Sequence, residues 1–204
     1  DLVGNTLLVW AHRRAVGPFM NTLHLFFGVG TFLAPIILAQ SVLRSEGIRL
    51  GYWLIALTIL PLALWVLRLP SPAAPEREEE KEGLSNVWLL SMLVLFFFVY
   101  VGAEIGFGGW VFTYSLKMGL TQETSAAYLT SAFWGAFTIG RLFSIPIAAK
   151  LRARWILSAD LIGCLLGLGL ILLYPDSLVA LWGGTIMIGL SMASIFPTMI
   201  TFAE

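Results

Sequence analysis

The sequence predicts an all-α protein that crosses a membrane several times, and three observations lead to this fold class. First, 58% of its 204 residues are hydrophobic and only 12% are charged, and its mean hydropathy of +0.88 lies outside the range of soluble domains. Second, apolar runs long enough to form membrane-crossing helices recur along the chain. Third, basic residues collect in alternate connections between these runs, as the positive-inside rule requires.

Six apolar runs can each cross roughly 30 Å of hydrocarbon as a helix. A further run, Asp1 to Ala11, covers only half of that distance. Because the chain begins inside this half-span and stops inside the last run, we expect a fragment of a larger helical bundle, truncated at both ends. The full spans are Phe19 to Leu43, Leu50 to Leu69, Val87 to Leu116, Ala126 to Ala149, Trp155 to Tyr174 and Leu178 to Ala203.

The twelve Lys and Arg residues indicate which connections face the cytoplasm. Three of them, Arg44, Arg49 and Lys117, fall on one side of the alternating spans, and the other nine fall on the opposite side. We expect the side with nine to be cytoplasmic, so that the runs beginning at Phe19 and Val87 lead outward. The nine are Arg13, Arg14, Arg68, Arg77, Lys81, Arg141, Lys150, Arg152 and Arg154.

The longest connection, PSPAAPEREEEKEG, divides the chain into two membrane parts. It is rich in proline and then in charge, a composition that disfavours a packed core. We expect residues 70–86 to form a cytoplasmic linker, either a plain solvated tether or a regulatory segment. Residues 1–69 would then end an N-terminal helical half with a half-span and two spans, and residues 87–204 would form the first four spans of a C-terminal half.

Several function classes find no support in the residues. The formal net charge is zero, and no clustered basic face suggests a nucleic-acid partner. The single cysteine, Cys164, excludes an intramolecular disulfide and a cysteine-based metal cluster. The sequence contains none of three common catalytic patterns: G-x-S-x-G, H-E-x-x-H or paired aspartates on one helix. We therefore expect no enzyme, no metal and no organic cofactor.

One carboxylate, Glu104, lies inside the third full span in the stretch YVGAEIGFGGW. A charge at the bilayer centre costs about 2.5–3.5 kcal/mol on insertion scales, so Glu104 should not face lipid. At 100° per residue it shares a stripe with Tyr100 and Gly108. Glu104 is therefore expected to line a pathway, or else to be a structural carboxyl between helices.

The glycines around Glu104 carry two further expectations. Those on a separate face of the helix suit close packing against a neighbour. The cluster GFGG predicts a weakened helix just outward of Glu104, as in the broken helices that line transport sites. The packing face consists of Gly102, Gly106 and Gly109.

Polar residues in other spans add to the candidates. Asn21 and His24 fall on one face of the first full span, where they would line an aqueous cavity or bond to a neighbouring helix. Trp110 could stack on a sugar ring or belong to the aromatic belt at the membrane surface. Arg141 and Asp160 lie at similar depths in consecutive spans, which predicts a structural salt bridge unless Arg141 snorkels to the interface.

Longer stretches of the sequence resemble a known family. GRLFSIPIAAKLRARW after a polar helix, together with the central charged linker, is similar to the basic loop in each half of the major facilitator superfamily. Three further stretches resemble the branch that contains fucose permease and the sodium-dependent glucose transporter. They are DLVGN, GPFMNTLHLFFGVGTFLAP and YVGAEIGFGGWVFTYSLKMGL. The resemblance covers essentially the whole chain, as part of the family's fourth helix through most of its tenth.

The resemblance implies a twelve-helix carrier that works by alternating access, with a sugar (hexose or deoxyhexose) coupled to a proton or a sodium ion. Its partners would be the sugar and the lipid of an inner or plasma membrane, with no nucleic acid, and the full-length protein would be a monomer. A carrier of another small polar metabolite, and a receptor or remnant that does not transport, are the alternatives. The expected substrate and ion ligands are Asp1, Asn5, Asn21, His24, Glu104 and Trp110.

Overall fold

The computed structural model describes residues 2–12, 16–45, 47–70, 87–148 and 150–203. These residues form helices joined by connections, without a strand among them, which confirms the predicted all-α membrane fold. Asp1 and residues 71–86 of the expected linker lie outside the described part of the chain. The helices are α1 (Leu2–His12), α2 (Val16–Ser45), α3 (Arg49–Val66), α4 (Val87–Lys117), α5 (Glu123–Ala148), α6 (Ala153–Leu173), α7 (Leu178–Met192) and α8 (Ile195–Ala203).

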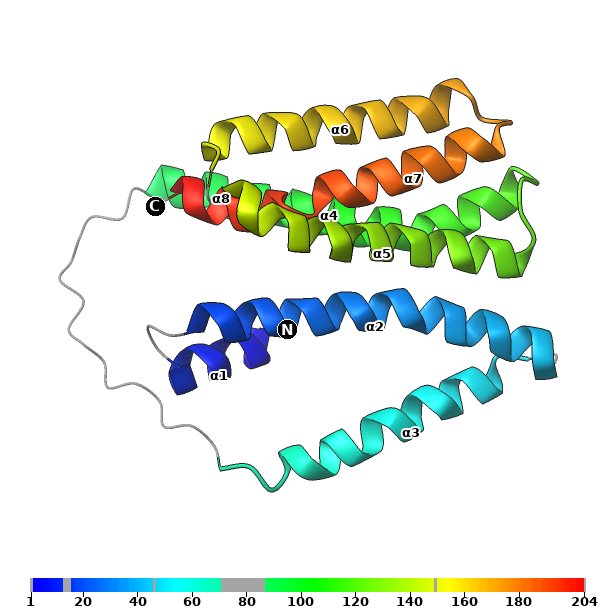
Figure 1. Ribbon diagram of the computed structural model, residues 1–204, viewed down its shortest axis with the longest axis horizontal. Helices are drawn as coiled ribbons and strands as arrows, with labels where there is room; N and C mark the ends of the chain where they lie inside the picture. Colours follow the sequence, from blue (N-terminus) through cyan, green and yellow to red (C-terminus); the bar gives the residue numbers. More distant parts are fainter. Residues whose placement is uncertain (1, 13–15, 46, 71–86, 149, 204) are drawn as a thin grey trace.

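The helices form two groups that meet along one line of contact. Helices α1 to α3 make up one group and α4 to α8 the other, and α2 runs along α5 over most of its length (Figure 1). The contact between α2 and α5 is the most extensive between any two of the described helices. We call it the α2–α5 seam.

Helix α5 lies where the two groups of helices meet. It packs against α2, α4 and α7, and its Leu129, Phe133 and Phe137 are fully buried. Five segments of the described chain are long and apolar enough to cross a membrane, and α5, with 26 residues, is not among them. The sequence predicted six such spans; a larger share of the residues is polar in α5 than in the other five, and three neighbouring helices pack against it.

The last predicted span is not one continuous helix. Helix α7 ends at Met192 and α8 begins at Ile195, so residues 193–194 form a break, the α7–α8 break. Pro197 has no N–H to donate to the carbonyl four residues earlier, and its ring crowds that carbonyl. Two side-chain hydrogen bonds lie at the break: the Tyr100 hydroxyl donates to the Met192 backbone carbonyl at 2.8 Å, and the Ser194 hydroxyl donates to the Asp160 side chain at 2.6 Å.

Helix α4 differs from the prediction in two ways. It is continuous from Val87 to Lys117, so GFGG does not break it. The expected packing glycines at 102, 106 and 109 have no neighbouring atom of the described chain within 4 Å of where a Cβ would lie. Gly108 makes the close contact instead, where a Cβ would lie 2.8 Å from the Trp134 ring, because the stripe of Tyr100, Glu104 and Gly108 faces the bundle.

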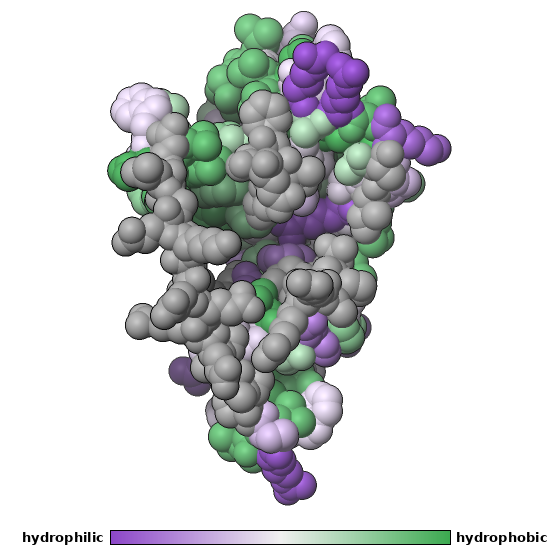
Figure 2. Space-filling view, turned by 90° about the vertical axis from the view of Figure 1, so that its left-hand side faces the viewer, coloured by the Kyte–Doolittle hydropathy of each residue, from purple (hydrophilic) through white to green (hydrophobic). Residues whose placement is uncertain are grey.

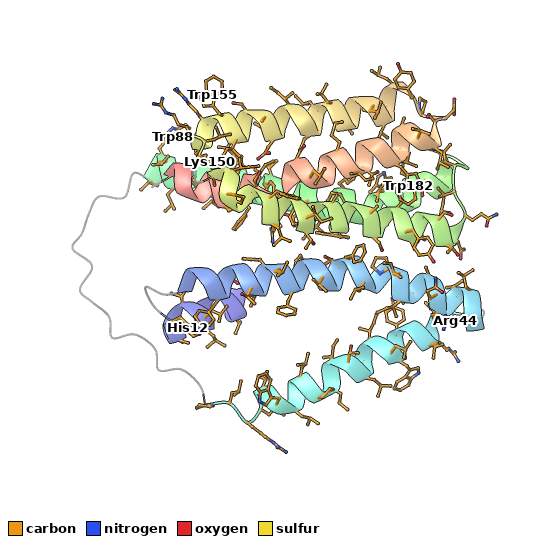
Figure 3. All side chains as sticks on the ribbon, viewed as in Figure 1. His12, Arg44, Trp88, Lys150, Trp155 and Trp182 are labelled. Atoms are coloured by element: carbon orange, nitrogen blue, oxygen red, sulfur yellow. The ribbon has the colours of Figure 1, made fainter. Side chains whose placement is uncertain are left out.

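The two ends of the bundle carry the charged and aromatic residues. Lys150, Trp88, Trp155 and His12 lie at one end, and Arg44 lies toward the other (Figure 3). Figure 2 looks onto the first of these ends, and hydrophilic side chains lie on it among hydrophobic ones. We refer to the Lys150 end and the Arg44 end; the Lys150 end is the one that the basic residues predict to be cytoplasmic.

Candidate functional site

Glu104 lies in the interior of the bundle, midway along α4. Only 8% of its surface is exposed, whereas most apolar side chains around the outside of α4 are exposed. Its carboxyl group lies within interaction range of the Tyr100 hydroxyl, one helical turn earlier, and of Arg141 on α5. The expectation that this carboxylate avoids lipid is therefore matched by its position.

Arg141 provides positive charge at this position. Its guanidinium lies over the Phe137 ring, 4.4 Å from the ring centroid, and it interacts with both Glu104 and Tyr100. Glu104 and Arg141 nevertheless lie further apart than the 4.0 Å of a direct ion pair. Because they form no direct ion pair, both groups keep hydrogen-bonding capacity for other partners.

His24 extends the same cluster across the seam. It lies on α2, is partly buried, and interacts electrostatically with Arg141. Ionisable groups from α2, α4 and α5 therefore meet, and they belong to both groups of helices. We call Glu104, Tyr100, Arg141 and His24 the seam cluster.

A cavity of about 360 Å³ opens along the seam, toward the Arg44 end. It begins at Gly108, one turn outward of Glu104, and three helices enclose it. Its walls are mostly apolar, with threonines and one carboxylate as the polar groups. The lining residues are Ala34, Pro35, Leu38, Ala39, Val42, Ile48, Gly108, Gly109, Phe112, Glu123, Thr124, Ala127 and Thr130.

Comparison with known proteins identifies the family. The model of the Major Facilitator Superfamily matches residues 3–204. The chain belongs to this family.

Individual relatives are similar over the whole chain. The sodium-dependent glucose transporter 1 of Xenopus laevis is 30% identical over 100% of this chain and 48% of its own length. The human protein of the same name is 28% identical over 100% of this chain and 47% of its own length. The major facilitator superfamily domain-containing protein 4A of Mus musculus is 23% identical over 100% of this chain and 59% of its own length.

The chain therefore spans about half the length of the curated relatives it matches. No solved structure matches it.

Of the residues predicted to bind substrate in this major facilitator chain, Glu104 and His24 come together. Asp1 lies outside the described residues, and so does the side chain of Asn21, whose backbone belongs to α2. Asn5 lies on α1, where its buried Oδ1 has no hydrogen-bond partner within the described chain.

Trp110 takes a different position from Glu104. It is 60% exposed, and the Lys117 ammonium lies 5.8 Å from the centroid of its ring. Six residues of helix place it about 240° round α4 from Glu104. Trp110 does not join the seam cluster.

Arg141 and Asp160, predicted to form a salt bridge, have other partners. Arg141 belongs to the seam cluster, and Asp160 accepts the Ser194 hydroxyl. The reason lies in the order of the helices, because α6 packs mainly against α7 and α8 rather than α5. Similar depth placed the two side chains at one level but not on facing surfaces.

Two members of the seam cluster were not predicted as site residues. Arg141 was assigned to a structural pair, and Tyr100 was placed only on the stripe with Glu104. The spacing of four residues between Tyr100 and Glu104, which places them on one helix face, was the available signal. Nothing in the sequence indicated that α5 lies beside that face.

Proposed function

We propose that this protein is a secondary active transporter that moves a sugar, a hexose or deoxyhexose, together with a proton or a sodium ion. Membership of a transporter family and the names of the similar proteins support the class. The observation that carries the proposal is the seam cluster, where a carboxylate, an arginine and a histidine meet between two groups of helices.

The chemistry of the cluster suits a sugar hydroxyl. The Glu104 carboxylate can accept a hydrogen bond from the hydroxyl while the Arg141 guanidinium donates one to its oxygen. Glu104 and Arg141 form no direct ion pair within 4.0 Å, so each can bond to such a group. The adjoining cavity of about 360 Å³ falls within the about 300–1,000 Å³ range of small-molecule sites.

The position of the cluster suits alternating access. Arg141 and His24 lie on opposite sides of the seam, so a rotation of one helix group against the other changes their interaction. A cation or proton that binds near Glu104 offsets the cost of a charge inside the membrane. Arg141 already attracts the carboxylate, so the added ion changes the net charge of the seam cluster and with it the ease with which the loaded carrier changes its orientation.

The basic connections support a cytoplasmic position for the Lys150 end and for residues 70–86 of a protein in the cell membrane. We expect the full-length protein to be a monomer whose partners are the lipid bilayer and the sugar. Size-exclusion chromatography with light scattering measures the oligomeric state directly.

The proposal is tested by uptake of radiolabelled glucose and fucose into proteoliposomes with an imposed sodium or proton gradient. We expect gradient-driven uptake by the unmodified protein and its loss in Glu104→Gln. Asp176→Asn is the matched control, because Asp176 is exposed in the connection between α6 and α7. Normal uptake by Glu104→Gln would show that the carboxylate is structural, and no uptake of either sugar by the unmodified protein would overturn the substrate assignment.

A further inference from the structure

A second membrane carboxylate, Asp160, lies away from the seam cluster. It sits on α6, eight residues into a helix that is apolar enough to span a membrane. None of the basic side chains that the structure describes lies within 4.0 Å of it. A charge at such a position requires compensation, and here no arginine or lysine of the described chain supplies it.

A hydroxyl group bonds to Asp160 instead, and a second hydroxyl lies against the next turn of α6. The Ser194 hydroxyl donates a hydrogen bond to the Asp160 carboxyl group at 2.6 Å. The Ser191 hydroxyl faces Gly163, where a side chain would overlap it. Because Gly163 follows Asp160 by three residues, the two lie on one face of α6, and both serines face it.

The α7–α8 break lies beside Asp160, because Ser194 belongs to it. The last carbonyls of a helix have no intrahelical donor, and α7 ends at Met192, between the two serines. The carboxyl end of a helix also carries partial negative charge, which attracts cations. Discontinuous membrane helices bind sodium ions in transporters with such carbonyls.

We propose that Asp160, Ser191, Ser194 and carbonyl oxygens at the end of α7 bind one sodium ion. The inference rests on the proposed function, because it assigns the coupling ion to sodium and places it at the α7–α8 break. A single carboxylate among neutral oxygens matches a monovalent cation, whereas divalent sites in proteins commonly use several carboxylates.

Tyr100 connects this site to the seam cluster. Its hydroxyl donates to the Met192 carbonyl at the α7–α8 break and lies within interaction range of Glu104 and Arg141. An ion that draws the carbonyls of α7 toward Asp160 changes the acceptor available to Tyr100. Ion occupancy is thereby transmitted to the sugar site through one side chain.

The test measures sodium binding without any sugar. Thermal unfolding of the detergent-purified protein is followed in sodium, potassium and choline chloride at equal ionic strength. We expect a saturable rise in Tm with sodium alone, and its loss in Asp160→Asn and Ser194→Ala. The controls, Ser158→Ala and Asp176→Asn, change exposed residues and should keep the rise.

Binding of radioactive sodium to the purified protein provides a second measurement. If Asp160→Asn does not fold, Ser194→Ala decides, because it keeps the carboxylate and removes one hydroxyl. Equal rises in all three salts, or sodium binding that persists in both variants, would overturn the site. Sodium binding lost in Glu104→Gln but kept in Asp160→Asn would also overturn it and place the ion in the seam cluster.

The outcomes separate this site from the proposed function. A protein that binds sodium through Asp160 but moves no sugar contradicts the proposed function and supports the site. A protein that moves sugar on a proton gradient and shows no response to sodium contradicts the site and supports the function.

Discussion

Glu104 and Asp160 are two carboxylates inside the same group of helices, and their surroundings differ. Glu104 lies next to the α2–α5 seam with Arg141 and His24 near it. Asp160 lies at the α7–α8 break, where the Ser194 hydroxyl bonds to it and the Ser191 hydroxyl lies against Gly163. The first charge is compensated within the protein, and the second depends on oxygen groups and, in our proposal, on an ion. Burial alone therefore does not define what a membrane carboxylate does.

Among the variants that test this comparison, removal of Arg141 should have the largest effect on stability. It leaves Glu104 without a positively charged neighbour, which is already the situation of Asp160 within the described chain. We expect Arg141→Gln to destabilise the protein by about 3 kcal/mol, the scale of a buried charge that loses its partner. The double variant Glu104→Gln with Arg141→Gln should recover most of the Tm. Arg152→Gln, at an exposed site, is the control, and an equal loss there would contradict the special position of Arg141.

A substitution that pushes α2 away from α5 should disturb the surroundings of Glu104 more than those of Asp160. Gly28 lies so close to Thr138 that a Cβ would overlap the threonine Oγ1, whereas Gly30 has no neighbouring described atom within 4 Å of that point. We expect Gly28→Val to lower stability by about 2 kcal/mol through overpacking, and Gly30→Val to have little effect. Transport should fall in Gly28→Val while its sodium-dependent rise in Tm persists. Loss of both responses would show that the two regions are not independent.

Tyr100→Phe should weaken the connection between the two regions. It removes the donor to the Met192 carbonyl, and the loss of one such hydrogen bond costs about 1 kcal/mol. We expect sodium to raise Tm as before but to stimulate sugar uptake less. Tyr52→Phe, at an exposed tyrosine of α3, is the control. Full stimulation in Tyr100→Phe would rule out transmission through this side chain.

The smallest effect is expected at the Arg44 end of the seam. The Gln40 amide donates to the Tyr128 hydroxyl between α2 and α5. Gln40→Leu should cost about 0.5 kcal/mol, the lower range for a partly exposed hydrogen bond. A double-mutant cycle with Tyr128→Phe measures the pair, and additive losses would mean that the two side chains do not interact across the seam.

Much of the fold could be predicted from the sequence, because apolar length and basic connections depend on the bilayer rather than on neighbouring helices. The start of α4 at Val87 and of α7 at Leu178 agree with the predicted spans. The α7–α8 break was not predicted, and GFGG was expected to break α4. Pro35, Pro61 and Pro146 lie inside unbroken helices, so proline alone does not decide. At the α7–α8 break, Tyr100 and Asp160 also supply partners.

The candidate site could be predicted only in part. Glu104 and its inward stripe followed from helix periodicity and the cost of a charge in lipid. The pairing of Arg141 with Asp160 was inferred from their similar depth in the membrane, which can be estimated from their positions along the two spans. A contact also depends on the order of the helices in space. That order brings α5 against α4 and α6 against α7, and no local pattern in either helix encodes it.

The polarity of α5 has a consequence for how the protein is made. A helix that carries Arg141 and several hydroxyl groups gains little from lipid by itself, so its insertion depends on partners that shield these groups. Helix α2, synthesised earlier, provides the longest surface for this purpose. Assembly and membrane integration of α5 are therefore one event, and a defect in the α2–α5 seam alters the topology of the nascent chain before it can alter transport.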